Sequence, residues 1–356
     1  MRPSELTIST PGRVCLFGEH QDYLSLPVIP CAVSLRAELS GRRRSDPRVD
    51  LDLPDIGSRE IFSLNDSPSY VRERDYYRSV YNVLRKHGLT FTGGFDCTVR
   101  STIPVNAGTS SSSAIVVGWA HFLARMSDQE LTPSPTDLGR WAYEAEVLEF
   151  GEPGGMMDQY ATAFGGVIAI DFLPEVRVEP LEADLGTIVI GDSREPKDTQ
   201  GILARVKDQV VDIVRRMNVP LSSADPGSLD FPGLTPDQRS LLAGTIRNRD
   251  ITVEARALLR RKPLDHRALG ALLSEHQRIL RESLRISTPK IDRMLDAALE
   301  AGAHGGKING SGGGGCMFAY APESPERVAE AIEREGGTAY IVHADRGSAV
   351  LANGRF

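Results

Sequence analysis

Short apolar runs dominate the first hundred residues, and longer apolar stretches at helical spacing follow them. Runs bounded by Gly, Pro or Thr predict strands over residues 6–9, 13–17, 36–39, 95–99 and 165–172. The continuous apolar stretch over residues 112–125 is wide enough for a helix that is buried on most sides. Apolar residues at three- and four-residue steps predict another helix over residues 137–149, with Thr136 or Asp137 as its cap.

The second half of the chain alternates helical and strand patterns. Helices are predicted over residues 198–216, 236–260, 266–284, 289–301 and 325–335. Strands are predicted over residues 187–190, 316–320, 339–343 and 349–351. Ser287 or Thr288 would cap the helix that starts at Pro289, and residues 219–235, rich in Pro, Ser and Asp, are predicted as a loop. We expect an α+β fold with two domains, residues 1–180 and 181–356, and a cleft between them.

Composition and charge narrow the class of protein. The 356 residues suffice for one large or two ordinary domains. Lys and Arg number 41 against 48 Asp and Glu, a formal net charge of −7, so we expect no broad basic surface and no nucleic-acid partner. The first ten residues lack the pattern of a targeting signal, and no stretch approaches the ~18 apolar residues of a membrane helix. We therefore expect a cytoplasmic protein without a membrane partner.

Cysteines and histidines give no sign of a disulfide framework or a zinc site. Cys15, Cys31, Cys97 and Cys316 are widely separated, and no pair is spaced as Cys-x-x-Cys. None of the seven histidines has the clustered spacing of a zinc ligand. We expect reduced, mostly buried thiols.

Glycine is the one unusual residue, with 34 copies where the usual ~7% of a chain would give about nine fewer. One glycine lies in residues 104–114, Pro-Val-Asn-Ala-Gly-Thr-Ser-Ser-Ser-Ser-Ala, which run directly into a predicted helix. Small residues allow close approach of a ligand, and the N–H groups and hydroxyls at a helix start attract anions such as phosphates. The segment has neither the Walker nor the Rossmann spacing. The alternative is a Ser-rich turn that merely caps a helix.

Three further segments carry candidate chemistry. Residues 307–316 hold five glycines in six positions, and the apolar residues that follow favour a packed loop over a flexible linker. Residues 151–159 place Asp158 just after a tight Gly-rich turn. Residues 11–23 place Arg13 at one end of a short apolar strand and Glu19, His20 and Asp22 at the other. Polar groups gathered beside a strand need partners, which a polyhydroxylated ligand would supply.

Together these segments resemble the GHMP kinase superfamily, which includes galactokinase, homoserine kinase and mevalonate kinase. Residues 11–23 are similar to the galactokinase signature Pro-Gly-Arg-Val-Asn-Leu-Ile-Gly-Glu-His-Thr-Asp-Tyr, residues 104–114 to the family's Pro-x-x-x-Gly-Leu-Ser-Ser-Ser-Ala loop, residues 155–159 to Gly-Ile-Met-Asp-Gln, and residues 307–316 to its third, Gly-rich motif. The resemblance covers nearly the whole chain. It implies a two-lobed fold with an N-terminal ribosomal-protein-like α/β domain, a C-terminal ferredoxin-like α+β domain and an active site between them.

The resemblance also implies an activity, the transfer of the γ-phosphoryl group of ATP to a hydroxyl of a monosaccharide or sugar acid. The anomeric hydroxyl is the expected acceptor. The substrates would be the sugar and ATP, and the chain would be a monomer or homodimer. Asp158 would accept or orient the hydroxyl and Arg13 would stabilise charge. By the same resemblance, Glu19, His20, Asp22 and Gly155 would bind the sugar, and Ser112 and Glu146 would hold Mg²⁺. The residues implied for ATP are Pro104, Asn106, Gly108, Thr109, Ser110, Ser111, Ser112, Ser113, Gly312 and Gly313.

Departures from the family pattern leave the substrate open. The signature has Asn where this chain has Cys15 and Thr where it has Gln21, and the expected sugar-contacting Tyr falls at Gly201. Residues 24–27 replace Asn-Gly-Gly-Phe, and the adenine-stacking Trp of galactokinases is not evident near residues 76–77. The alternatives are a mevalonate-type kinase and a non-catalytic sugar-sensing protein on the same fold.

Single residues have structural alternatives too. Arg13 and Asp158 could form a buried salt bridge without catalytic function, and Glu146 could lie on a solvated helix face. His276 is expected to be structural, and Lys197 is as consistent with a solvated surface position as with a phosphate contact.

Overall fold

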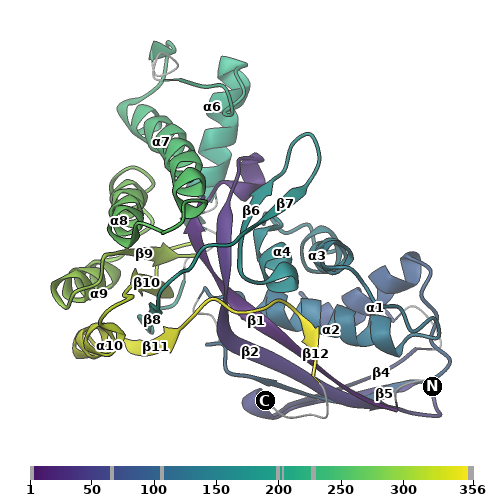
Figure 1. Ribbon diagram of the computed structural model, residues 1–356. Coiled ribbons are helices and arrows are strands. Elements are labelled where there is room, and N and C mark those ends of the chain that lie inside the picture. Colours follow the sequence, from purple (N-terminus) through teal and green to yellow (C-terminus); the bar gives the residue numbers. More distant parts are fainter. Residues whose placement is uncertain are drawn as a thin grey trace.

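A computed structural model describes residues 4–64, 68–104, 108–197, 201, 202, 204–225 and 230–351 of the chain. Their strands form two sheets, and the helices pack beside them (Figure 1). The α+β class expected from the sequence is confirmed. No helix of the described residues is long and apolar enough to cross a membrane.

The first sheet is built around two long antiparallel strands, β1 (Glu5–Phe17) and β2 (Ile29–Arg43), which run through the centre of the molecule (Figure 1). The sequence predicted two separate strands within β1, over residues 6–9 and 13–17, which Pro11 and Gly12 separate. The structure instead has one strand, in which a register shift between these two residues absorbs the irregularity.

Further strands extend the first sheet on both sides of this pair. The sheet order is β12-β1-β2-β5-β3-β4, and β6 joins β2 and pairs with β7. These strands are β3 (Arg48–Leu53), β4 (Ser58–Ser63), β5 (Phe95–Ser101), β6 (Val167–Asp171), β7 (Arg177–Leu181) and β12 (Ala349–Val350). Two short 3-10 turns, Asp22–Leu24 and Pro54–Ile56, lie in the connections.

Helices α1 (Tyr76–Lys86), α2 (Ser111–Met126), α3 (Pro135–Tyr143) and α4 (Met157–Phe164) gather on one side of this sheet (Figure 1). The core is aromatic where α2 meets the sheet: Trp119 is stacked on Phe122, and both rings meet Phe95 edge to face. All three side chains are fully buried. Since burying one such side chain stabilises by about 1.5 to 3 kcal/mol, this cluster fixes α2 on the sheet.

The predicted helix over residues 137–149 proved to be two elements. The helix α3 starts at Pro135, and Ser134 caps it in a reciprocal capping box with Asp137. The prediction of Thr136 or Asp137 as the cap was therefore wrong. After Tyr143 the backbone continues as a π-helical turn, Glu144–Leu148, and buries Glu146. Such wide turns are frequent at functional sites.

The second sheet has the order β11-β8-β10-β9, and its neighbouring strands are antiparallel. Helices α8 (His266–Glu282), α9 (Pro289–Glu300) and α10 (Pro325–Arg334) surround it (Figure 1). The strands are β8 (Ile188–Asp192), β9 (Gly305–Asn309), β10 (Cys316–Tyr320) and β11 (Thr338–Val342). Farther from the sheet lie α6 (Gln209–Met217), preceded by a π-helical turn (Ala204–Asp208), and α7 (Pro236–Leu259).

Most predicted elements of the second half are confirmed to within a few residues, including Thr288 as the cap of α9 and Pro289 as its first residue. Residues 198–200 and 203 of the predicted helix over 198–216 lie outside the described residues. The pattern did not reveal the short or irregular elements α1, α4, β3, β4, β7 and β9.

The division into domains at residue 180 stays a prediction. The chain does pass from the first sheet to the second between Leu181 and Ile188. However, β12 returns to the first sheet and pairs with β1 at Ile8 and Ser9. The end of the chain thus ties the second half back to the first.

A buried ion pair links the two halves. Lys307 of β9 is fully buried, and its ammonium lies 2.6 Å from Glu19, whose side chain is 3% exposed. The ammonium also donates hydrogen bonds to the carbonyls of Cys15 (2.9 Å) and Ile308 (2.8 Å). Because the charges of Lys307 and Glu19 are both out of water, each depends on the other for its stabilisation.

All four cysteines are free and buried, as expected.

We predict that Lys307→Met lowers the free energy of unfolding by about 3 to 5 kcal/mol, because it leaves the Glu19 carboxylate buried and unpaired. Chemical denaturation measures this change. The double variant Lys307→Met with Glu19→Gln should recover most of the loss. The control is Lys262→Met, which breaks a Lys–Glu pair with 69% and 85% exposed side chains and should cost under about 1 kcal/mol. Equal losses for the two single variants would contradict the prediction.

Candidate active site

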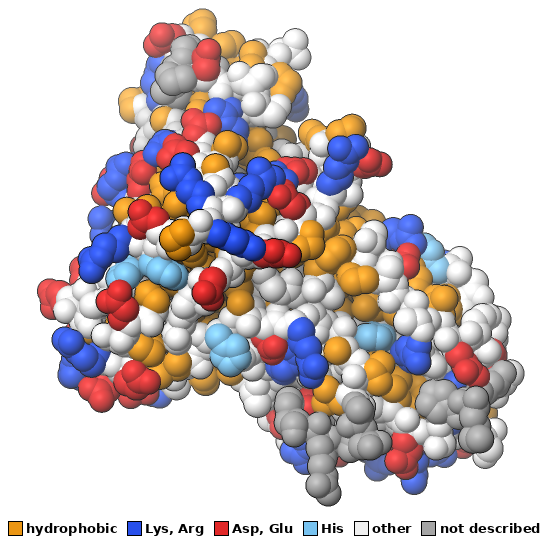
Figure 2. All heavy atoms as spheres, viewed as in Figure 1, with side chains coloured by type: hydrophobic (Ala, Val, Ile, Leu, Met, Phe, Trp, Pro, Cys, Tyr) orange, Lys and Arg blue, Asp and Glu red, His pale blue; other side chains and the backbone are white. Residues whose placement is uncertain are grey.

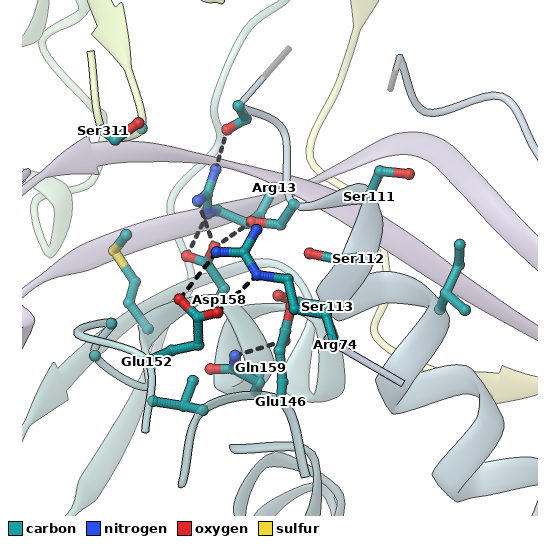
Figure 3. Close-up of a pocket in the computed structure, with 18 of the residues that line it drawn as sticks. Arg13, Arg74, Ser111, Ser112, Ser113, Glu146, Glu152, Asp158, Gln159 and Ser311 are labelled. Carbon is teal, nitrogen blue, oxygen red and sulfur yellow. Dashed lines mark hydrogen bonds and ion pairs between the residues drawn. The ribbon is translucent and has the colours of Figure 1, made fainter. Parts of the chain in front are cut away.

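The predicted site segments meet in one cavity of about 630 Å³. Its lining includes Arg13 from β1, the serines before and at the start of α2, and Asp158 from α4, with the start of the Gly-rich segment, Gly310 and Ser311, on another side. In Figure 3, Arg13 and Asp158 lie between Ser311 and the serine-bearing helix. Segments separated by up to 300 residues in the sequence thus surround a volume that can hold small molecules.

Arg13 and Asp158 form a two-pronged ion pair at the centre of this cavity (Figure 3). The Nε of Arg13 donates to Oδ1 of Asp158 at 2.8 Å, and Nη2 donates to Oδ2 at 2.7 Å. The Arg13 side chain is 5% exposed and that of Asp158 is 29% exposed. Asp158 lies in the first turn of α4, where the helix dipole favours a negative charge. The carboxylate is therefore fixed in orientation yet open to the cavity.

The charge of Arg13 is stabilised by its surroundings. Burial by itself would lower the pKa of Arg13, but the carboxylates of Asp158 and Glu19 outweigh burial, so the pKa is raised. The remaining guanidinium nitrogen, Nη1, donates to the carbonyl of Gly108 at 2.5 Å. Arg13 thus connects Asp158 to the serine loop, which we define as residues 108–113.

The serine loop is shaped to approach a ligand closely. Gly108 has φ +90°, which strongly favours glycine, and Ser110 has φ +58°. Ser110 precedes α2, but its hydroxyl does not cap the helix; it donates to Oδ2 of Asp158 at 2.6 Å. The alternative of a simple capping turn is therefore not what the structure shows. The first N–H groups of an α-helix have no partner within the helix, so a helix start can bind an anion.

The other residues expected to bind ATP have different positions. Pro104, Gly108 and Ser110–Ser113 line the cavity, and Asn106 lies outside the described residues. Thr109 is buried, and its hydroxyl has no hydrogen-bond partner among the described residues. In the Gly-rich segment it is Gly310 and Ser311 that line the cavity. Gly312 packs on Ile286, and the N–H of Gly313 donates to the carbonyl of Ile286. Roles for Gly312 and Gly313 stay predictions.

Glu146 is a buried carboxylate whose partners in the described residues are neutral. Its Oε2 accepts a hydrogen bond from Gln159 at 2.7 Å (Figure 3). Burial raises the pKa of Glu146, while hydrogen bonds from Ser112, Gln159 and Ser113 oppose the rise. A buried carboxylate next to serine hydroxyls, with no cation paired to it in the described part of the chain, fits the oxygen ligands that Mg²⁺ prefers. The described residues contain no group of three or more His, Cys, Asp or Glu that could hold a metal by themselves.

Asp22 and Gly155 touch each other at the other end of the cavity. A Cβ on Gly155 would collide with the Asp22 carboxylate, so this glycine is what allows the close contact. Oδ1 of Asp22 accepts the Tyr23 N–H at 2.9 Å. Burial, with the nearby negative charge of Asp158 as a second cause, raises the pKa of Asp22 to about 6.

His20 is held in one orientation by two neighbours. Its Nδ1 lies 2.8 Å from the Tyr23 hydroxyl, and its Nε2 lies 3.0 Å from the carbonyl of Ser311. Since a carbonyl only accepts, Nε2 carries a proton in the neutral ring and Nδ1 accepts from Tyr23. Burial lowers the pKa of His20, which favours this neutral form.

Glu19, also expected to bind sugar, lines the cavity but has Oε2 committed to Lys307 at 2.6 Å. Its role as a sugar ligand stays a prediction. His276, expected to be structural, is fully buried and stacked on Phe17. It is absent from the lining of the cavity.

Sequence reasoning left several lining residues unassigned. Lys197 lines the cavity, and a Cβ on Gly108 would lie 3.4 Å from its ammonium. Burial lowers the pKa of Lys197, whose side chain is half-buried, and a phosphate contact for this residue stays a prediction. Arg74 and Glu152 form a two-pronged ion pair of 2.6 and 2.9 Å beside the cavity (Figure 3). In the sequence, the only available signal for these residues is their proximity to a motif; Glu152, for example, lies three residues before Gly155.

Basic and acidic side chains are interspersed over the face seen in Figure 2. This distribution agrees with the net charge of −7. It gives no continuous basic surface for a phosphate backbone on that face.

Three family models match the chain, in the order expected from the motifs. Residues 2–43 match the galactokinase galactose-binding signature, residues 75–166 the N-terminal domain of GHMP kinases, and residues 255–338 the C-terminal part of GHMP kinases. The resemblance inferred from short motifs is therefore confirmed over most of the chain.

Relatives of known name cover nearly the whole chain. Human galactokinase is 30% identical over 376 residues, which span 98% of this chain and 92% of the relative. Mevalonate kinase of Thermococcus gammatolerans is 27% identical over 345 residues, which span 94% of each chain. Galactokinase of Haemophilus influenzae is 26% identical over 370 residues, which span 98% of this chain and 95% of the relative.

Solved structures show the same fold. Lactococcus lactis galactokinase complexed with galactose has a TM-score of 0.85 at 21% identity, covering 98% of this chain and 96% of the other. Methanococcus jannaschii mevalonate kinase has a TM-score of 0.73 at 19% identity, covering 97% and 100%. With three family models in order and a relative 30% identical over nearly its full length, the chain belongs to the GHMP kinase family.

Proposed function

We propose that this protein is a sugar kinase that transfers the γ-phosphoryl group of ATP to a monosaccharide or sugar acid. The proposed acceptor is the anomeric hydroxyl. The observation that carries the proposal is the Arg13–Asp158 pair, which faces the serine loop on one side and the Asp22 segment on the other within one cavity. Family membership supports the phosphoryl transfer, and the galactokinase signature over residues 2–43 supports a sugar as acceptor.

Asp158 would receive the acceptor hydroxyl. Its carboxylate is held by Arg13 and Ser110, so a substrate hydroxyl within hydrogen-bond distance would be aligned for attack on the phosphorus and would give its proton to Asp158. Arg13 would then balance the negative charge that spreads over the transferred group. In this type of reaction most of the catalysis comes from positioning and electrostatic stabilisation, which a rigid, buried ion pair supplies.

The nucleotide would lie along the serine loop. The N–H groups at the start of α2 and the serine hydroxyls would bind phosphate oxygens, and the Lys197 ammonium beside Gly108 would add a positive charge. Ser112 and Glu146 would hold Mg²⁺. When bound, this ion neutralises charge on the phosphate oxygens. Tyr76 and Tyr77, which line the same cavity, are candidates to contact the base.

The sugar would lie against Asp22, His20 and Gly155. A carboxylate accepts hydrogen bonds from adjacent hydroxyls, and the missing side chain of Gly155 allows the Asp22 carboxylate to lie against the backbone there. Mevalonate kinase is the second candidate, because relatives of that name match as much of the chain. The buried polar set around Asp22 favours the sugar. The cytoplasmic location and the monomeric or dimeric state stay predictions.

The proposal is tested with purified protein, ATP and Mg²⁺ against hexoses, uronic acids, mevalonate and homoserine, with ADP release as the readout. We expect turnover with at least one sugar or sugar acid and none with mevalonate. Phosphorus NMR of the product then identifies the hydroxyl that is modified. Turnover with mevalonate alone would defeat the sugar proposal.

Asp158→Asn should reduce kcat by about 10² to 10⁴-fold, because the amide cannot take the proton of the acceptor. The matched control is Asp345→Asn, since Asp345 (25% exposed) also pairs with a buried arginine, Arg36, at 2.7 Å. Asp345 does not line the cavity, so this variant should lose a similar amount of stability but keep its kcat. Comparable kcat for both variants would remove Asp158 from its assigned role.

Affinity for the sugar should fall as the pH drops through about 6, the raised pKa of Asp22. Above this pH the carboxylate accepts hydrogen bonds from sugar hydroxyls; below it, protonation removes much of that capacity. Sugar binding measured by calorimetry between about pH 5 and 8 checks this. Asp22→Asn should bind more weakly than wild type above about pH 6 and lose the transition near 6. A transition that persists in the variant would assign it to another group, such as His20.

A further inference from the structure

Asn309, the last residue of β9, lies where three elements of the site meet. Its side chain is fully buried. Its Oδ1 accepts the backbone N–H of Cys15 in β1 at 2.8 Å, and its Nδ2 donates to the carbonyl of Gly108 in the serine loop at 2.8 Å. The next residue, Gly310, lines the cavity. One amide thus connects β1, the serine loop and the Gly-rich segment.

The carbonyl of Gly108 receives two donors at once. Nη1 of Arg13 approaches it at 2.5 Å and Nδ2 of Asn309 at 2.8 Å. The loop is also pressed against β9, because a Cβ on Gly108 would lie 2.7 Å from the carbonyl oxygen of Asn309. A contact this close leaves no room for the serine loop to slide along β9.

Holding this carbonyl has consequences for both neighbours in the cavity. In a trans peptide the carbonyl of Gly108 and the N–H of Thr109 point in opposite directions, so fixing one fixes the other. The carbonyl of Thr109 in turn accepts the backbone N–H of Arg13 at 3.1 Å. Arg13 is therefore attached to the loop through its backbone and its guanidinium, and the orientation of the guanidinium sets that of Asp158.

We propose that Asn309 is a positioning residue for phosphoryl transfer: its amide holds the Gly108 peptide in the orientation that aligns the serine loop with the Arg13–Asp158 pair. The inference rests on the proposed kinase function. It concerns a residue that touches neither proposed substrate and that acts through Gly108 and Arg13.

The chemistry of the amide is what the position requires. The Cys15 N–H needs an acceptor and the Gly108 carbonyl needs a donor, and both lie within reach of one short side chain. An ionised aspartate has the same shape but no donor. At position 15, where the galactokinase signature has Asn, this chain has Cys, and the backbone N–H of Cys15 donates to the side-chain amide of Asn309.

The test is Asn309→Asp, which keeps the size of the side chain, replaces its donor by an acceptor and places an ionisable carboxyl at the same position. We expect kcat to fall by about 10²-fold, because a misplacement on the order of 1 Å suffices for such a loss, and KM for the sugar to change by less than about threefold. Asn309→Ala, which removes both hydrogen bonds, should lose at least as much kcat. Unchanged kcat in Asn309→Asp would overturn the proposal.

The matched control is Gln277→Glu. Gln277 lies in α8 and contacts β9 one residue before Asn309. Oε1 of Gln277 accepts the N–H of Ile308, the residue before Asn309, at 2.8 Å, and its Nε2 donates to Ser287 at 3.1 Å, away from the cavity. This variant makes the same chemical change in a similarly buried amide of the core, where Nε2 also donates to Asp292 at 3.4 Å. Because the new carboxylate would face that of Asp292, we expect at least as large a drop in thermal stability, with a kcat within about threefold of wild type. Equal kcat losses in both variants would show that Asn309 acts only through general stability.

A pH profile separates positioning from packing. A protonated carboxyl has an O–H that can donate to Gly108, so the kcat of Asn309→Asp relative to wild type should rise as the pH is lowered from about 8 to about 6. A ratio that stays flat, with kcat still reduced, would indicate disturbed packing and overturn the proposal.

A measurement of nucleotide binding tests the role of Asn309 separately from the proposed kinase function. The dissociation constant for ADP with Mg²⁺ needs no turnover; it should rise about tenfold in Asn309→Asp and less than about twofold in Gln277→Glu. If wild type phosphorylates no acceptor, the proposed function fails while this comparison still tests the inference. If wild type is active and both variants bind ADP and turn over like wild type, the inference alone fails.

Discussion

A buried arginine is the constraint around which this site is built. The Arg13 guanidinium is nearly inaccessible to water, so its charge and its donors must be satisfied within the protein. Asp158 supplies the charge, and the carbonyl of Gly108 accepts from the one nitrogen that Asp158 does not reach. Because these partners come from segments about 95 and 145 residues away, satisfying Arg13 brings the serine loop and the first turn of α4 to the same place.

The second buried cation has a different function. Lys307 pairs with Glu19 and two backbone carbonyls in a fully buried environment, so it ties β9 to β1 without facing a ligand. Asn309 follows two residues after Lys307 in β9, and its neutral amide connects β1 to the serine loop. The two halves of the chain are thus joined by polar contacts of defined direction. Such contacts fix geometry more strictly than apolar packing, which tolerates small shifts.

The sequence predicted what depends on local pattern or on whole motifs. The helices α2 and α7–α9 follow apolar spacing, and the motif residues Arg13, Asp158 and Ser110 proved to be neighbours. The π-helical turn that buries Glu146 could not be predicted, because a single turn of five residues is too short to reveal a wider period in the apolar pattern. The pairing of Glu19 with Lys307 and the role of Asn309 also escaped, since both are contacts between residues nearly 300 positions apart.

The central claim is that Asp158 and the serine loop meet the acceptor and the nucleotide, respectively, in one cavity. A crystal structure of the protein with a turned-over sugar and a non-hydrolysable ATP analogue tests it most directly. We predict a sugar hydroxyl within ~2.6–3.2 Å of an Asp158 carboxylate oxygen, with the phosphates against the start of α2. A sugar with no hydroxyl near Asp158, or a nucleotide bound away from residues 108–113, would contradict the account.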